Sequence, residues 1–143
     1  MSEFNFPTRY DEAAADEGVW TSVIDEMDNL WGRFKLCLFD ETTQRYRLTM
    51  ERLMRKYRNA AKSNPGSKEK TNEERAVEVF VELALVDWEI TNKAGKAIPF
   101  SKEAAVRYLM APQALYVQNA IVAFARDVRN FQPEEQTELP EGN

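Results

Sequence analysis

The sequence contains no histidine, and Cys37 is its only cysteine among 143 residues. A single cysteine cannot form an intrachain disulfide, and without histidine the chain lacks the commonest metal ligand and the usual proton acceptor at neutral pH. The five glycines are scattered, so they form no phosphate-binding loop. We therefore expect no catalytic residue, no metal site and no cofactor, and we predict that the protein is not an enzyme.

Long apolar runs are also missing from the sequence. No run approaches the roughly 18 residues that cross a bilayer, and the first residues lack the basic and then apolar order of a secretory signal. We expect a cytoplasmic protein that has no contact with a membrane. At 143 residues and 16.6 kDa the chain has the length of one domain, which buries enough surface to fold without disulfides.

Charges of both signs are abundant and unevenly distributed along the chain. Residues 1–41 carry ten acids and three bases, residues 42–70 two acids and nine bases, and residues 71–143 twelve acids and seven bases. A basic middle segment therefore lies between two acidic ones. Such asymmetry bears on partners and association rather than on the fold.

The first acidic segment divides into an arm and a predicted β-hairpin. Residues 1–17 show no sustained period, so the sequence leaves the structure of this arm open. Two runs of β-forming residues follow, Val19–Ile24 and Leu30–Phe39, and apolar residues alternate with others in the second run. These runs predict a hairpin with one buried face. The alternative is a helix that starts at Ser22 and continues to Leu30.

A basic amphipathic helix is predicted over residues 43–62, with Asp40 as its N-cap. Its apolar side chains fall on one arc, and basic side chains, including Arg52 and Arg55, cover the rest. A basic face can follow a phosphate backbone, but the tyrosines of the apolar arc are expected in the core, and the pI of 4.9 is low for a nucleic-acid-binding domain. We expect a face that is solvated or that pairs with acidic segments of the protein itself.

The second half begins with a polar segment, residues 63–70, which is predicted to be an exposed loop. Thr71 and Glu74 then have the spacing of a capping box, and a helix is predicted from about Asn72 to Trp88. Most of its residues are apolar, so the rest of the chain, or in part a second subunit, must cover it on nearly all sides. We expect it to be the central element of the core.

The stretch from Val86 to Ser101 is expected to join this helix to the next through a short polar turn. Trp88 and Phe100 flank the turn, and two interpretations remain open. The rings close the end of a helical core, or they border a groove that binds a partner.

The remaining residues predict helices and a polar tail. Ser101 can cap a short helix, which ends before Pro112. A last helix, over residues 112–131, spaces its apolar residues in steps of three and four, Val117 and Phe124 among them. Residues 132–143 are polar, acidic and contain proline, and we expect them to be disordered.

These elements predict an α+β fold that is mainly α-helical. An N-terminal β-hairpin is followed by four to five helices in a single globular domain over residues 18–131, between the arm at 1–17 and the tail at 132–143.

Four segments of the second half form a distinctive pattern through their order and spacing along the chain: Glu82–Glu89, the turn at residues 92–96, Ile98–Ala105 and Ala123–Phe131. Together they resemble the tail assembly chaperones of long-tailed bacteriophages, and the resemblance runs from about Gly18 to Phe131. It implies a protein of the host cytoplasm, absent from the mature virion, that binds the tape measure protein, keeps it soluble and helps recruit tail tube subunits. It also implies a longer form, made by ribosomal frameshifting, that takes part in tube recruitment.

We expect partner-binding residues on the basic helix, beside the turn and on the last helix: Arg52, Arg55, Trp88, Phe100, Val117 and Phe124. The same surfaces are candidates for a homo-oligomer. The alternative function is a structural tail or head-tail connector subunit that stays in the virion. A nucleic-acid-binding protein that uses the basic helix ranks third.

Overall fold

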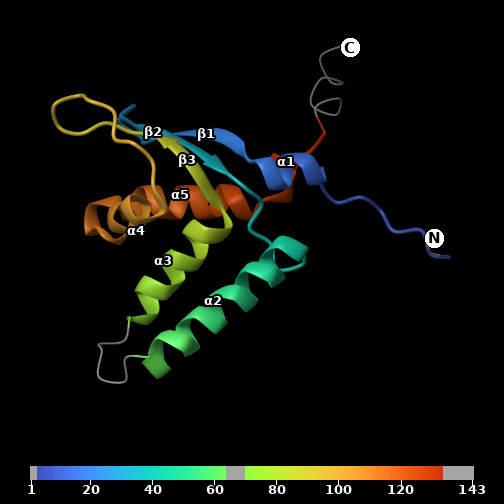
Figure 1. The fold of residues 1–143 in the computed structure, drawn as a ribbon. Coiled ribbons are helices and arrows are strands. Elements are labelled where there is room, and N and C mark those ends of the chain that lie inside the picture. Colours follow the sequence, from blue (N-terminus) through green and yellow to red (C-terminus); the bar gives the residue numbers. More distant parts are fainter. Residues whose placement is uncertain (1–2, 64–69, 134–143) are drawn as a thin grey trace, which may run out of the picture.

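The structure, a computed structural model, describes residues 3–63 and 70–133. It contains a three-stranded antiparallel sheet and five α-helices (Figure 1). The predicted fold class, α+β and mainly helical in one domain, is confirmed. The elements are α1 (Glu12–Glu17), β1 (Val19–Ile24), β2 (Leu30–Leu36), α2 (Gln44–Ser63), α3 (Asn72–Leu83), β3 (Leu85–Glu89), α4 (Lys102–Met110), the 3-10 turn η1 (Pro112–Ala114), α5 (Leu115–Arg126) and the 3-10 turn η2 (Val128–Phe131).

The predicted hairpin is present. Strand β1 pairs antiparallel with β2, with Val19 opposite Leu36 and Ile24 opposite Leu30. The alternative helix from Ser22 to Leu30 is wrong, because these residues complete β1 and turn into β2.

The sheet has a third strand that the sequence analysis assigned to a helix. Helix α3 ends at Leu83, and Leu85–Glu89 forms β3, which pairs antiparallel with β2. The prediction of a continuous helix to Trp88 is therefore wrong beyond Leu83. Branched and aromatic residues of this segment favour a strand, and the strand pairs backbone groups on the free edge of β2 that would otherwise lack partners.

Helix α3 passes into β3 through Ala84 alone, and other parts of the chain hold this junction. The backbone N–H of Cys37, just after β2, donates to the carbonyl of Ala84 at 2.8 Å. The Nε of Arg45, in the first turn of α2, donates to the carbonyl of Leu83 at 2.9 Å. Carbonyls in the last turn of a helix have no partner within the helix, so these two bonds fix β2 and α2 to the end of α3.

Lys102 holds the same junction from the start of α4. Its Nζ donates to the carbonyls of Val81 and Leu85, at 2.8 Å each. Burial lowers the pKa of Lys102 from its ordinary value of 10.5. The ammonium group is thus a cross-link between α3, β3 and α4.

The first prediction concerns this cross-link. Lys102→Met keeps a long apolar side chain but removes both hydrogen bonds, so we expect the free energy of unfolding to fall by about 2 to 3 kcal/mol. Urea denaturation followed by circular dichroism measures it. Lys93→Met, in the exposed turn at residues 92–96, is the control and should change stability by less than about 0.5 kcal/mol. Equal midpoints for the two variants would contradict the role of Lys102.

The core lies between the sheet and the helices (Figure 1). The sheet contributes Val23, Phe34, Leu36, Leu85 and Trp88, and the helices contribute Val77, Phe80, Val81, Ala105, Leu109, Val117, Ile121 and Ala125. Helix α3 supplies several buried residues, as expected for a central element.

The arm, whose structure the sequence left open, contains α1. Ala15 of α1 packs against Leu38 and Phe131 in a second, smaller cluster. The backbone N–H of Asp11 donates to the carbonyl of Phe131 at 2.7 Å, and its carboxylate accepts from the N–H of Ala14. These contacts hold α1 against the C-terminal end of the described chain.

Two helix ends differ from the prediction. Helix α2 is capped by Thr43, whose hydroxyl accepts from the N–H of Tyr46 at 3.1 Å, and not by Asp40, which contacts Arg9 and Thr42. The last predicted helix is broken: α5 ends at Arg126, because Asp127 has an extended backbone conformation and caps η2.

The predicted caps of α3 and α4 are confirmed. The hydroxyls of Thr71 and Ser101 accept from the backbone N–H groups of Glu74 and Ala104. The predicted loop at 63–70 and the predicted disordered tail fall largely on residues 64–69 and 134–143, which lie outside the described residues. Within the described ranges, no helix is long and apolar enough to span a membrane.

Candidate partner-binding surfaces

The structure places Trp88 and Phe100 against each other. Their rings meet edge to face at 5.3 Å, and Trp88 is 5% exposed. The indole Nε1 of Trp88 donates to the carbonyl of Ile98 at 2.8 Å, and its ring also contacts Tyr108. Trp88 therefore packs inside the chain, where it fixes the segment after β3 against α4.

The other four expected site residues are separated from this pair and differ in exposure. Val117 is fully buried in the core, and Phe124 is half-buried against Phe131, with ring centroids 6.0 Å apart. Arg52 is paired with Glu82 at 3.2 Å, whereas Arg55 is exposed. The structure does not bring the six residues together into one site.

Helix α2 lies beside α3 (Figure 1), and polar contacts connect the two helices. Leu53 is its buried residue. The hydroxyl of Tyr57 donates to Glu78 of α3 at 2.9 Å, next to the Arg52–Glu82 pair. This attachment leaves a second side of α2 facing solvent.

The solvent-facing side of α2 forms an open hollow of about 540 Å³, which we call the α2 groove. Tyr46, Met50 and Met54 line it at four-residue spacing, in one row along the helix. Tyr46 and Met50 are half-buried and Met54 is 38% exposed. Further lining residues are Glu41, Thr42, Thr43, Arg47, Glu51, Arg55 and Arg58.

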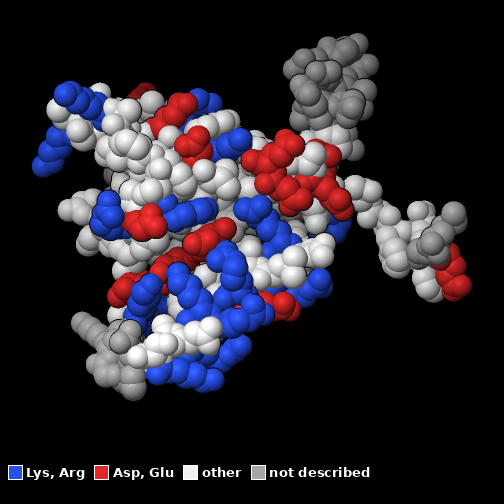
Figure 2. Space-filling model, viewed as in Figure 1, with Lys and Arg blue, Asp and Glu red and all other residues white. Residues whose placement is uncertain are grey.

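The charge around the α2 groove is mainly basic, because its three arginines outnumber Glu41 and Glu51. In Figure 2 the Lys and Arg side chains gather over α2, while acidic side chains gather over α1. Arg47, Arg55 and Arg58 are exposed and form no ion pair with any residue the structure describes. Sequence reasoning found this basic face but assigned the apolar arc to the core. The signal it missed is that the arginines follow the apolar row along the same side of the helix.

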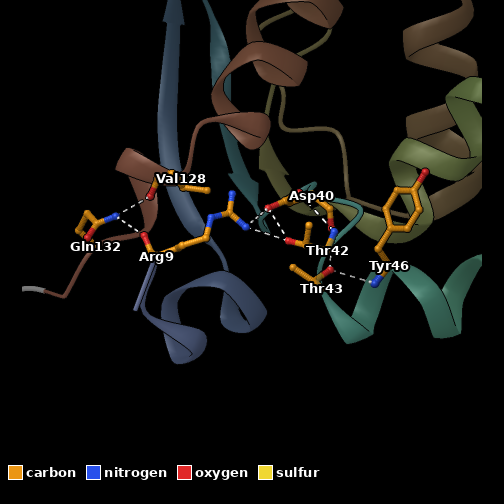
Figure 3. A network of polar contacts seen from close by, with 7 residues as sticks. All are labelled: Arg9, Asp40, Thr42, Thr43, Tyr46, Val128 and Gln132. Carbon is orange, nitrogen blue, oxygen red and sulfur yellow. Dashed lines mark hydrogen bonds and ion pairs between the residues drawn. The ribbon is translucent and has the colours of Figure 1, made fainter. Parts of the chain in front are cut away.

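A polar network next to the α2 groove joins both ends of the described chain (Figure 3). The guanidinium of Arg9 lies 3.1 Å from the carboxylate of Asp40 and donates to the hydroxyl of Thr42 at 2.9 Å. The amide of Gln132 donates to the carbonyls of Arg9 and Val128. Burial acts to raise the pKa of Asp40, but hydrogen bonds from Thr42 and the nearby Arg9 outweigh it and lower that pKa.

A second exposed apolar surface lies at the turn of the β1–β2 hairpin. Its members are large apolar residues with 40% to 77% of their surface exposed, and we call them the hairpin-tip patch: Ile24, Met27, Leu30, Leu115 and Tyr116. Trp31 stacks on Tyr116 at 5.7 Å, and the hydroxyl of Tyr116 donates to the carbonyl of Ile24 at 3.4 Å. The hairpin turn and the start of α5 therefore form one surface.

Asp25 orders the hairpin turn. Its carboxylate accepts from the indole Nε1 of Trp31 at 2.8 Å and from the backbone N–H groups of Met27 and Asn29. The bond from Trp31 and those from Asn29 and Met27 lower the pKa of Asp25 to about 2. With Glu26 and Asp28, the turn presents an acidic margin beside the apolar patch.

A third surface, the α3–α5 groove, is a hollow of about 340 Å³ with largely apolar walls. Half-buried Val79 of α3 and Val122 of α5 both line it. Arg75 lies at its edge, with its guanidinium over the ring of Tyr57 at 5.0 Å, and its buried Nε has no acceptor among the described residues. The full lining is Phe39, Arg75, Ala76, Val77, Val79, Phe80, Leu109, Gln118, Val122 and Arg126.

The described part of the chain contains no group of three or more His, Cys, Asp or Glu side chains that could hold a metal ion. Cys37 is buried, its Sγ contacts the carbonyl of Asp16 at 3.2 Å, and burial raises the pKa of its thiol. A raised pKa keeps the thiol in its less reactive, protonated form.

A family model described as YdaY prophage protein matches residues 41–142. The chain belongs to the YdaY prophage protein family. The matched region includes every lining residue of the α2 groove and all but Phe39 of the α3–α5 groove. No curated protein and no solved structure matches the chain.

Membership of the YdaY family shows that the protein is phage-related. The family description names no tail component and no client.

The second prediction concerns the attachment of α2 in this YdaY-family protein. Burial, followed by the hydrogen bond to Glu78, raises the pKa of Tyr57 from 10.0 to about 12. The stabilisation from this bond is fully present below pH 10 and is lost as the pH rises toward about 12. Tyr57→Phe should cost about 1 kcal/mol at pH 7 and should remove this loss at high pH.

Two measurements test this prediction. Alkaline titration of tyrosine absorbance should lose its last-titrating group in Tyr57→Phe, and hydrogen exchange should speed up in α2 more than in the sheet. Tyr10→Phe is the control, because no hydrogen bond of the Tyr10 hydroxyl is recorded within the described residues. If Tyr57→Phe instead lost a group that titrates near pH 10 and kept the last-titrating group, the assignment would be refuted.

Proposed function

We propose that the protein is a phage tail assembly chaperone that binds the tape measure protein, keeps it soluble and helps recruit tail tube subunits. The observation that carries the proposal is the α3–α5 groove. Its apolar walls and basic margin are suited to the apolar stripe of an amphipathic helix, a recurring mode of peptide recognition. The tape measure protein is long and largely helical, so it offers such stripes repeatedly.

Membership of a prophage family and the charge of the surface support the same role. A chaperone that holds an apolar client needs enough charge to keep the complex dissolved, and charged residues make up 30% of this chain. In this proposal the protein has no catalytic activity and no cofactor, acts in the host cytoplasm and is absent from the mature virion. Its longer, frameshifted form binds the tail tube subunits.

The third prediction tests client binding by co-expression with the tape measure protein of the same prophage. The wild-type chain should keep the tape measure protein in the soluble fraction and should co-purify with it. Val122→Gln places a polar amide in the α3–α5 groove and should reduce the soluble client severalfold, because the client's apolar side chains lose their contact.

Ala123→Gln is the matched control, since it is the next residue of α5 and is exposed. Both variants should give the circular dichroism spectrum and melting temperature of the wild type within a few degrees. A tape measure protein that stays insoluble with the wild-type chain would rule out the proposed function. Mass spectrometry of purified virions separates the alternative, because a structural tail or connector subunit would be found in the particle.

A further inference from the structure

We propose that the α2 groove of one copy of the protein binds the hairpin-tip patch of a second copy. Both surfaces offer accessible apolar side chains, half-buried Tyr46 and Met50 with exposed Met54 on α2 and exposed ones on the hairpin. The charge is opposite: the three arginines of the α2 groove outnumber its two glutamates, whereas the charged residues of the hairpin turn are acidic. A contact between them buries apolar surface on both copies and pairs opposite charges. This self-association is separate from client binding, which the proposed function assigns to the α3–α5 groove.

The basic side of the contact explains why the partner is acidic. Arg47, Arg55 and Arg58 have no ion pair among the described residues, whereas the neighbouring Arg52 is neutralised by Glu82. Two α2 grooves placed face to face would bring together three arginines and only two glutamates from each copy, and an excess of like charge destabilises an interface. The groove therefore favours an acidic surface over a copy of itself.

The acidic side of the contact distinguishes the hairpin tip from α1. Helix α1 is also acidic, but the residue that it exposes between its acids is Ala13, which offers little apolar surface. The hairpin tip combines Glu26 and Asp28 with Met27 and Leu30, which are 77% and 63% exposed. It therefore matches both the charge of the α2 groove and its apolar row.

The hairpin turn is also ordered before it binds. Four hydrogen bonds to the carboxylate of Asp25 hold the turn, one from Trp31, one from Met27 and two from Asn29. A preordered surface loses less conformational entropy on association than a flexible one. The turn that carries the exposed side chains of Met27 and Leu30 therefore loses little further conformational entropy on binding.

The position of the two surfaces determines the kind of assembly. The hairpin turn lies at the end of the sheet away from α1, whereas α2 extends beside α3 away from the sheet (Figure 1). Each copy that binds through its groove still presents a free tip. Such head-to-tail contacts produce a ring if they close and an open row if they do not.

The fourth prediction uses light scattering of the purified full chain after size-exclusion chromatography. Loading concentrations should reach about 500 μM, because small interfaces bind weakly. The wild-type average mass should rise above 16.6 kDa with concentration. A groove variant, Met54→Glu with Arg58→Glu, and a tip variant, Glu26→Lys with Leu30→Lys, should each raise the dissociation constant at least about tenfold.

An equal mixture of the two variants decides between contact geometries. The groove variant keeps its tip and the tip variant keeps its groove, so the mixture should form pairs that stop at two chains. If α2 instead contacted α2 symmetrically, the tip variant alone would associate as the wild type does, and that result would overturn the proposal. A wild-type chain that keeps the mass of one copy at every concentration would also overturn it.

Two controls keep the result interpretable. Glu103→Lys with Arg107→Glu makes the same kinds of charge change on exposed positions of α4 and should associate as the wild type does. Raising the salt concentration from about 50 mM to about 500 mM should weaken the wild-type contact, since the charges are exposed.

Duplex DNA that binds a monomeric wild type and not the groove variant would overturn the proposal in favour of a nucleic-acid surface. None of these measurements contains a tape measure protein, so they leave the proposed function independently testable.

Discussion

The direct passage of α3 into β3 is the constraint on which the rest of the fold depends. With Ala84 as the only residue between helix and strand, the direction of α3 fixes the plane of the sheet. The carbonyls at this junction would lack partners if the chain simply turned, and Arg45, Lys102 and the backbone N–H of Cys37 satisfy them. Three segments far apart in sequence are thereby held at one point, so α2, β2 and α4 take their places together.

The parts of the fold that were predictable are those with local signals. The β1–β2 hairpin follows from alternation in two neighbouring runs, and the caps of α3 and α4 follow from Thr71 and Ser101. Strand β3 could not be predicted in the same way, because the same short run of apolar residues is equally compatible with a continuation of α3. Its partner is β2, about fifty positions earlier in the chain, and only that pairing decides in favour of a strand.

The candidate surfaces could likewise be predicted from the sequence only in part. The basic face of α2 was visible in the sequence. Which residues of its apolar arc are buried and which stay accessible was not visible, because this depends on the side chains that α3 places against α2. Glu78 and Glu82 engage Tyr57 and Arg52, so α2 needs to bury little more than Leu53. The row of Tyr46, Met50 and Met54 therefore remains partly accessible to solvent. The hairpin-tip patch was missed because its members are separated in sequence, and α5 brings Leu115 and Tyr116 beside the turn.

The separation of acidic and basic residues on the folded chain affects how copies of the protein interact. The acidic and basic segments lie next to each other in sequence, yet the fold places the acidic hairpin turn and the basic α2 on different parts of the molecule (Figure 1). The acidic hairpin turn and the basic α2 therefore do not neutralise each other within one copy, and each can attract the opposite charge of another copy at short range. At longer range each copy has a formal net charge of −5, and repulsion between copies opposes their accumulation. A surface of this kind favours specific, limited contacts over unrestricted aggregation, because attraction requires the matched patches to meet while repulsion acts in every other orientation.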